Sequence, residues 1–203
     1  MFFSVRILGA GDIHGNVFLA ESLAEKAVSE KVDLVVLCGD LIDEDSSENV
    51  LKPFKDRNLK TLFVHGNHES KASADFLSYI NKARFLHGYG ARYEDIGFFG
   101  CGSANIGIHG LSEQEIFKTL GKAHEGISYL DKKVMVTHVH PSGSKMESLS
   151  RFVPGSSGVS DAIKKFKPSV VLCSHVHEAQ GLEEQVEGVR VINVGPKGKI
   201  IDL

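Results

Sequence analysis

Five apolar, strand-like runs in this chain each end in side chains that commonly bind metal ions. In order, these side chains are Asp12 with His14, then Asp40, Asn67, His138, and finally His175 with His177. In open α/β sheets, ligands gather beyond the carboxyl ends of the strands. We therefore expect these five endings, which are far apart in the sequence, to converge in space.

The first half of the chain predicts a parallel sheet covered on both faces. After the run that delivers Asp12, Asn16 is a plausible N-cap for a helix over residues 16–30, where apolar residues recur at helical spacing. Strands over 33–38 and 60–64 follow, separated by a poorer helix that contains Pro53 and starts near Asp45 or Ser46. A helix over 71–82 ends this parallel, doubly covered half.

The second half is richer in short strands. Alternating and aromatic runs in 84–102 predict hairpin strands, and 103–110 is a loop placed to overhang the site. Ser112 and Glu115 form a capping box for a helix that ends near residue 123. The remaining elements are a strand at 133–138, a long loop at 141–158, a helix at 160–167, a strand at 170–174, and short strands at 182–186, 189–194 and 199–203. Two sheets in contact, with helices outside, are expected.

Composition and charge favour one soluble domain over residues 1–203. The chain has 203 residues, of which 42% are hydrophobic, and a formal net charge of −3, so a nucleic-acid partner is disfavoured. Cys38, Cys101 and Cys173 are widely spaced and predict reduced core thiols. The opening residues lead into the first strand, and no apolar stretch reaches the roughly 18 to 20 residues that span a bilayer. We expect a cytoplasmic protein without membrane contact; a homo-oligomer is left open.

The seven candidate ligands are two carboxylates, one amide and four imidazoles, which are too many for a single tetrahedral ion. They suit two divalent ions that share Asp40, the sole ligand offered by its strand. Two ions about 3.5 to 4 Å apart hold a bridging hydroxide as nucleophile and stabilise an in-line phosphoryl displacement. The mixed nitrogen and oxygen set favours Mn, with Fe, Zn, Ni or Co as alternatives, over Ca or Mg.

These motifs together resemble those of the calcineurin-like metallophosphoesterases, and they occur in that family's order. They are Asp12-x-His14, Gly39-Asp40-x-x-Asp43, Gly66-Asn67-His68-Glu69, His138 and His175-x-His177. The resemblance implies an α/β fold, a four-layer α/β/β/α sandwich of two mixed sheets flanked by helices, with a dinuclear centre between the sheets. The chain is most similar to the small, single-domain bacterial and archaeal-type members.

The resemblance also implies a role for each site residue. One metal ion would be held by Asp12, His14, Asp40 and His177, and the other by Asp40, Asn67, His138 and His175. His68 would not bind metal; it would protonate the leaving alkoxide, a role typically worth about 10² to 10⁴ in rate. Asp43 would orient His68, or alternatively cap the following helix.

Three departures from the family pattern bear on function. Ser174 stands before His175 where the family usually has Gly, which is tolerable if the backbone φ stays negative. His140 follows His138 by two residues, where it is placed to crowd or assist the site. Glu44 follows Asp43 in place of the Arg-Gly of protein Ser/Thr phosphatases, which argues against protein dephosphorylation and tilts the expectation towards diesters.

We therefore predict a metal-dependent phosphoesterase that hydrolyses small phosphomonoesters or phosphodiesters. A non-catalytic, metal-binding interaction scaffold of the same fold is one alternative, but the complete ligand set favours an enzyme. A nuclease is the other, although the sequence shows no basic or aromatic path to the site. Gly9 and Gly11 also suggest a dinucleotide fingerprint, but His14 occupies its third glycine position. Substrate specificity is assigned to the loops at 103–110 and 141–158.

Overall fold

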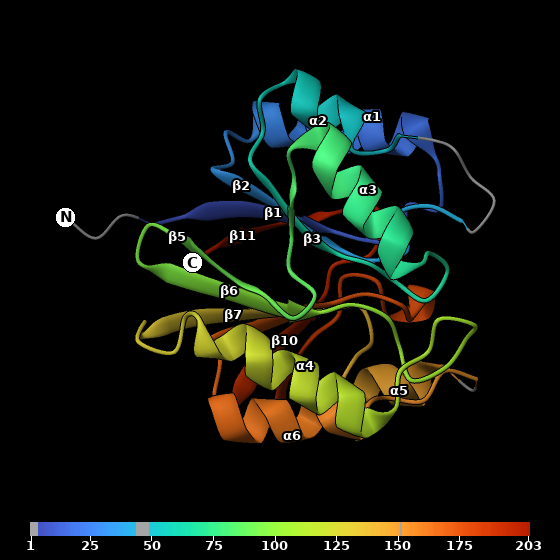
Figure 1. Cartoon of the computed structure of the whole chain (residues 1–203), viewed down its shortest axis with the longest axis vertical. Coiled ribbons are helices and arrows are strands. Elements are labelled where there is room, and N and C mark those ends of the chain that lie inside the picture. Colours follow the sequence, from blue (N-terminus) through green and yellow to red (C-terminus); the bar gives the residue numbers. More distant parts are fainter. Residues whose placement is uncertain (1–3, 44–48, 151) are drawn as a thin grey trace.

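The computed structural model describes residues 4–43, 49–150 and 152–203 and has four layers (Figure 1). Two mixed β-sheets face each other, and helices cover the outer face of each. The first sheet carries α1 (Val17–Ser29), α2 (Lys52–Asp56) and α3 (Lys71–Asn81), and the second carries α4 (Glu113–Glu125) and α6 (Ser157–Phe166). The predicted α/β/β/α sandwich is confirmed.

The first sheet is mostly parallel, as predicted. Its strand order is β11 (Lys199–Asp202), β1 (Arg6–Ala10), β2 (Leu34–Cys38), β3 (Thr61–Val64) and β4 (Arg84–Phe85). Strands β1 to β4 are parallel, whereas β11 pairs antiparallel with β1, with Ile201 opposite Ile7. Residues 84 and 85 were expected in a hairpin, but they pair with β3 instead. Nothing in the sequence indicated that the last strand returns to this sheet.

The second sheet has a parallel centre and antiparallel edges. Its order is β5 (Gly90–Tyr93), β6 (Ile96–Cys101), β7 (Lys132–Thr137), β8 (Val170–Cys173), β10 (Val189–Asn193) and β9 (Glu183–Val186). Strands β5 and β6 form the predicted hairpin, and β6, β7, β8 and β10 run parallel. Each sheet therefore contains several parallel strands, and a loop follows the carboxyl end of each of them.

Apolar side chains fill three separate interfaces, which explains why the central strands read as continuous apolar runs. Along β2, Val35 and Leu37 pack under the helices, whereas Val36 and Cys38 pack against the opposite sheet. Because side chains alternate along a strand, a strand buried on both faces shows no polar alternation. Strands held on both faces are a firm support for the loops that follow them.

The helix ends match the predicted caps at two helices and differ from the prediction in the segment 141–158. Asn16 accepts a hydrogen bond from the Leu19 amide at 3.0 Å, and the capping box at Ser112 is formed. The prediction of an uninterrupted loop over 141–158 was wrong, because this segment contains a short helix, α5 (Lys145–Leu149). The next helix begins at Ser157, not at residue 160, because the Ser156 side chain caps it. The N-cap expected at Asp45 or Ser46 lies outside the described residues.

The three cysteines are free and buried, as expected for core thiols. Cys38 lies between the sheets, whereas Cys101 and Cys173 face the helices of the second sheet. None of the described helices is long and apolar enough to cross a membrane.

Candidate metal centre

Each expected metal ligand follows the carboxyl end of a parallel strand. Asp12 and His14 follow β1, Asp40 follows β2, Asn67 follows β3, His138 follows β7, and His175 and His177 follow β8. Strands β1 to β3 belong to the first sheet, and β7 and β8 belong to the second. The structure therefore brings the ligands together where the two sheets meet.

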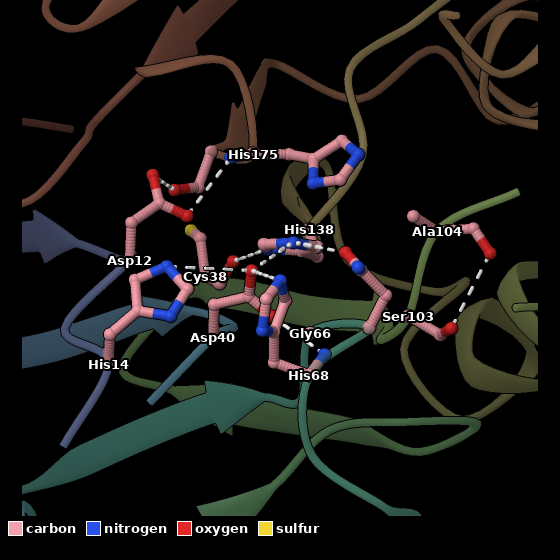
Figure 2. A network of polar contacts seen from close by, with 12 residues as sticks. Asp12, His14, Cys38, Asp40, Gly66, His68, Ser103, Ala104, His138 and His175 are labelled. Atoms are coloured by element: carbon pink, nitrogen blue, oxygen red, sulfur yellow. Dashed lines mark hydrogen bonds and ion pairs between the residues drawn. The ribbon is translucent and has the colours of Figure 1, made fainter. Parts of the chain in front are cut away.

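The side chains form two neighbouring clusters with ligand-like spacing (Figure 2). One cluster contains Asp12, His14 and His177, and the other contains Asp40, His138 and His175; Figure 2 shows all of these except His177. Within each cluster, one nitrogen or oxygen atom per residue lies within 4.8 Å of the others. Asn67 joins the second cluster, because its Oδ1 lies 3.1 Å from His138 Nε2.

Asp40 lies at the junction of the two clusters, between His14 and His68 in Figure 2. Its Oδ2 atom is 3.2 Å from His138 Nε2, 3.8 Å from His14 Nε2 and 3.9 Å from His68 Nε2. The residue is only 3% exposed. A single buried carboxylate oxygen thus faces imidazoles from three different loops.

Hydrogen bonds on the far side of the rings determine which imidazole nitrogen faces the centre. His138 Nδ1 lies 2.8 Å from the carbonyl oxygen of Cys38, which can only accept, so Nδ1 carries the proton. His14 Nδ1 likewise lies 2.9 Å from the Asp43 carboxylate. Both rings therefore present Nε2 to the centre, as metal-binding histidines do when a carbonyl or carboxylate holds the other nitrogen.

The donor set fits divalent cations electrostatically. Burial opposes ionisation of Asp40, but the adjacent His138 outweighs it and holds the pKa of Asp40 well below its usual range. Burial disfavours charge on His138 too, yet Asp40 raises the pKa of His138 to about 9. Burial and the nearby His138 lower the pKa of His175. Its buried Nε2 has no hydrogen-bond partner among the described residues. A neutral imidazole with an unused buried nitrogen is suited to bind a cation.

The backbone is strained at four of these positions. Asp12, His14, Asp40 and His175 have φ values of 54°, 48°, 49° and 72°. Such left-handed conformations cost about 1 to 3 kcal/mol each and persist only where surrounding contacts impose them. Here the Asp12 amide donates to the Gly39 carbonyl at 3.0 Å, and the His14 amide donates to the Asp40 carbonyl at 2.9 Å. The two loops thus hold each other in the strained form.

His68 and Asp43 lie at the mouth of the centre. The His68 side chain is 50% exposed, so it is accessible to a substrate. Asp43 Oδ1 lies 3.5 Å from His68 Nδ1 but only 2.9 Å from His14 Nδ1. The contact with His14 was not expected from the sequence. The N-cap of α2 is Leu51, so Asp43 does not cap that helix; the residues that directly follow Asp43, 44–48, lie outside the described residues.

Glu69, the last residue of the Gly66-Asn67-His68-Glu69 motif, has a structural role that was not predicted from the sequence. It is 1% exposed and accepts hydrogen bonds from the Gly66 amide at 2.8 Å and the Leu41 amide at 3.1 Å. These bonds join the loops after β2 and β3. Burial and the charge of Asp40 raise the pKa of Glu69 to about 7, despite the two amide donors. The only sequence feature that could have indicated this role is the position of the glutamate directly after the Asn67-His68 pair.

The loop at 103–110 packs against the centre, in the overhanging position expected for it. A Cβ atom at Gly107 would lie 3.0 Å from the Asn67 amide nitrogen. Glu113, at the start of α4, connects this loop to the 141–158 segment: it accepts hydrogen bonds from Asn105 Nδ2 at 2.9 Å and from Ser156 Oγ at 2.5 Å. His140, by contrast, is fully buried and does not line the exposed mouth.

Comparison with known proteins adds independent evidence. A family model described as calcineurin-like phosphoesterase matches residues 5–179. No curated protein sequence matches the chain significantly.

Three solved structures illustrate the similarity of fold. A protein from Thermus thermophilus superimposes with a TM-score of 0.76 at 16% identity, covering 99% of each chain. A dimetal phosphatase from Danio rerio has a TM-score of 0.62 at 10% identity, covering 94% of this chain and 87% of that chain. A structure described as a novel archaeal phosphodiesterase has a TM-score of 0.56 at 19% identity, covering 98% of this chain and all of that chain. At these identities the likeness concerns the fold alone.

Proposed function

Because the chain belongs to the calcineurin-like phosphoesterase family, and is thus a hydrolase of phosphate esters, we propose that it acts through a dinuclear metal centre on small phosphate esters. The match over residues 5–179 includes every residue of the two clusters.

The position of Asp40 carries the dinuclear proposal. Its Oδ2 lies within 3.9 Å of the Nε2 atoms of His14, His68 and His138, which come from three different loops. A carboxylate oxygen between two ligand clusters is suited to be shared by two ions. A single ion would leave the converging ligand atoms of the other cluster without a cation.

The proposed ligands divide as the clusters do. Asp12, His14, Asp40 and His177 would hold one ion, and Asp40, Asn67, His138 and His175 would hold the other. When bound, two divalent cations supply an activated water at neutral pH and neutralise the charge of the phosphate. Mn is proposed as the metal, with Fe, Zn, Ni and Co as alternatives.

His68 is the proposed proton donor to the leaving group. Its half-exposed ring stands beside Asp40, so a substrate phosphate at the centre would have its leaving oxygen within reach of this imidazole. A positioned acid of this kind is typically worth about 10² to 10⁴ in rate. Its position at the mouth distinguishes it from the buried His138.

The surroundings favour diesters over monoesters. Among the described residues, no Lys or Arg forms an ion pair with Asp12, Asp40 or Asp43. A monoester dianion would therefore depend on the metals for nearly all of its charge neutralisation. A diester carries one negative charge and needs less.

The test compares metal-depleted protein with protein reconstituted with Mn, Ni, Co or Zn, using p-nitrophenyl phosphate and bis-p-nitrophenyl phosphate as substrates. We expect turnover only after reconstitution, and faster turnover of the diester. His68→Ala should retain about two metal ions while losing roughly 10² in rate or more, whereas Asp40→Ala should lose metal.

Failure of the test is equally informative. Metal binding without turnover of either ester would favour the interaction scaffold over the enzyme. Equal rates for wild type and His68→Ala would remove the proposed acid. Binding of nucleic acid that weakens steeply with salt would support the nuclease instead.

A further inference from the structure

We propose that Ser174 is a positioning residue that orients the Asp12 carboxylate and so tunes the metal site formed with His14 and His177. The proposal rests on the dinuclear centre proposed above. It concerns a residue that does not bind metal and that replaces the glycine usual at this place in the family.

The Ser174 hydroxyl contacts the Asp12 carboxylate directly. Ser174 is fully buried, and its Oγ donates a hydrogen bond to Asp12 Oδ2. The other oxygen, Oδ1, accepts the backbone amide of His175 at 3.2 Å. Asp12 is therefore held at both oxygens by two consecutive residues of the loop after β8, on the opposite sheet.

The oxygen that Ser174 contacts also faces the ligand cluster. Asp12 Oδ2 lies 3.8 Å from His177 Nε2. A hydroxyl donor at this oxygen fixes the rotation of the carboxylate about its Cβ–Cγ bond and would occupy one lone pair of the oxygen, leaving the other for a bound metal ion. A glycine at this position cannot supply such a donor.

The chain makes room for this hydroxyl at Gly11. A Cβ atom at Gly11 would lie 2.6 Å from Ser174 Oγ and 2.9 Å from Ser174 Cβ, whereas its next neighbour, the Cys38 carbonyl oxygen, is 3.4 Å away. Ser174 is not among the described residues with positive φ, because the left-handed turn falls on His175. Serine therefore fits without backbone strain, provided that residue 11 has no side chain.

Hydrogen-bond partners of metal ligands typically change metal affinity by roughly 10- to 100-fold. The expected loss on removing the hydroxyl is confined to one site, because the Ser174 hydroxyl donates to Asp12, which belongs to one cluster, and not to the shared Asp40. Selective loss of one site is a result that general destabilisation does not produce.

The experiment titrates Mn²⁺ into metal-free protein and follows binding by calorimetry and by electron paramagnetic resonance. Wild type should bind two ions and show exchange coupling at two equivalents. Ser174→Ala and Ser174→Gly should bind the first ion as wild type does, but the second roughly 10- to 100-fold more weakly, with an uncoupled signal at low metal. Ser160→Ala, which removes another buried serine hydroxyl in α6, is the matched control and should behave as wild type.

A double-mutant cycle with Gly11 separates packing from hydrogen bonding. Gly11→Ala should lower both the melting temperature and the affinity of the second ion, because its methyl group displaces Ser174. In the Ser174→Gly background, the same change should restore the melting temperature but not the affinity. Equal affinities at both sites in wild type and Ser174→Ala would overturn the proposal. Failure of wild type itself to bind two ions would instead contradict the dinuclear centre.

Discussion

Replacing Asp43 with Asn tests which histidine this carboxylate serves. Asp43 Oδ1 is 2.9 Å from His14 Nδ1, a hydrogen-bond distance, and 3.5 Å from His68 Nδ1, which is too long for a good one. Asparagine has a similar shape and retains one oxygen acceptor, but it loses the negative charge and carries an NH₂ donor in place of the second oxygen. The substitution therefore removes the charge that favours the correct orientation of His14, with little change in packing.

The magnitude follows from the exposure of the pair. A hydrogen bond to a charged group is worth about 1.5 to 3 kcal/mol when buried, but the side chains of His14 and Asp43 are 27% and 54% exposed. Solvent screening reduces the contribution to about 1 kcal/mol, which is about a fivefold loss of affinity at the Asp12, His14 and His177 site. The longer contact with His68 is worth a few tenths of a kcal/mol, so kcat at saturating metal should fall only about twofold.

The assay measures Mn²⁺ affinity by calorimetry and kcat for bis-p-nitrophenyl phosphate at saturating Mn²⁺. Asp75→Asn is the control, because Asp75 is 55% exposed and pairs with Lys71 on α3, away from the centre. An unchanged metal affinity together with a more than tenfold loss of kcat would refute this reasoning. Asp43 would then act through His68, and the effects of Asp43→Asn and His68→Ala would not be additive.

Three further predictions concern the charges and loops of the centre. The pKa of His138 is about 9 in the metal-free protein, so metal binding at pH 7.5 should release about one proton, and metal affinity should rise with pH up to about pH 9. Calorimetry in buffers of different ionisation enthalpy measures the number of protons released. Glu69 binds its proton more tightly in the folded state, where its pKa is about 7 against 4.5, so the stability of metal-free protein should fall as pH rises through this range, by about 3 kcal/mol. Urea titrations of Glu69→Gln at pH 5 and 8 should show a correspondingly smaller fall. If the loops at 103–110 and 141–158 set specificity, as expected from the sequence, Glu113→Ala should free both and raise KM by about two- to tenfold, an ordering cost of about 0.5 to 1.5 kcal/mol, with metal content unchanged.

The secondary structure of the strands that carry the ligands was predictable because it depends on local pattern. The runs at 33–38 and 60–64 are apolar on both faces, and β2 and β3 are buried on both faces in the structure. Caps were predictable for the same reason, as Asn16 and Ser112 show. The helix inside 141–158 was missed because Met146 is its only buried residue, so α5 shows no apolar periodicity.

The contacts between the two sheets could not be predicted from the sequence, because they depend on packing between segments a hundred or more residues apart. The His138 Nδ1 bond to the Cys38 carbonyl and the Ser174 bond to Asp12 both cross from one sheet to the other. Sequence patterns identified the side chains able to bind metal, but they did not assign the contacts that orient them: Asp43 was expected beside His68 and lies closer to His14, and Ser174 was noted only as a departure from the family pattern. A residue that orients a metal ligand needs only one hydrogen-bond donor or acceptor, which many residue types supply. Such residues therefore cannot be recognised from their residue type in the sequence. At this centre, therefore, the residues suited to bind metal can be recognised from local sequence patterns, whereas the orientation of their side chains depends on contacts that form only in the folded chain.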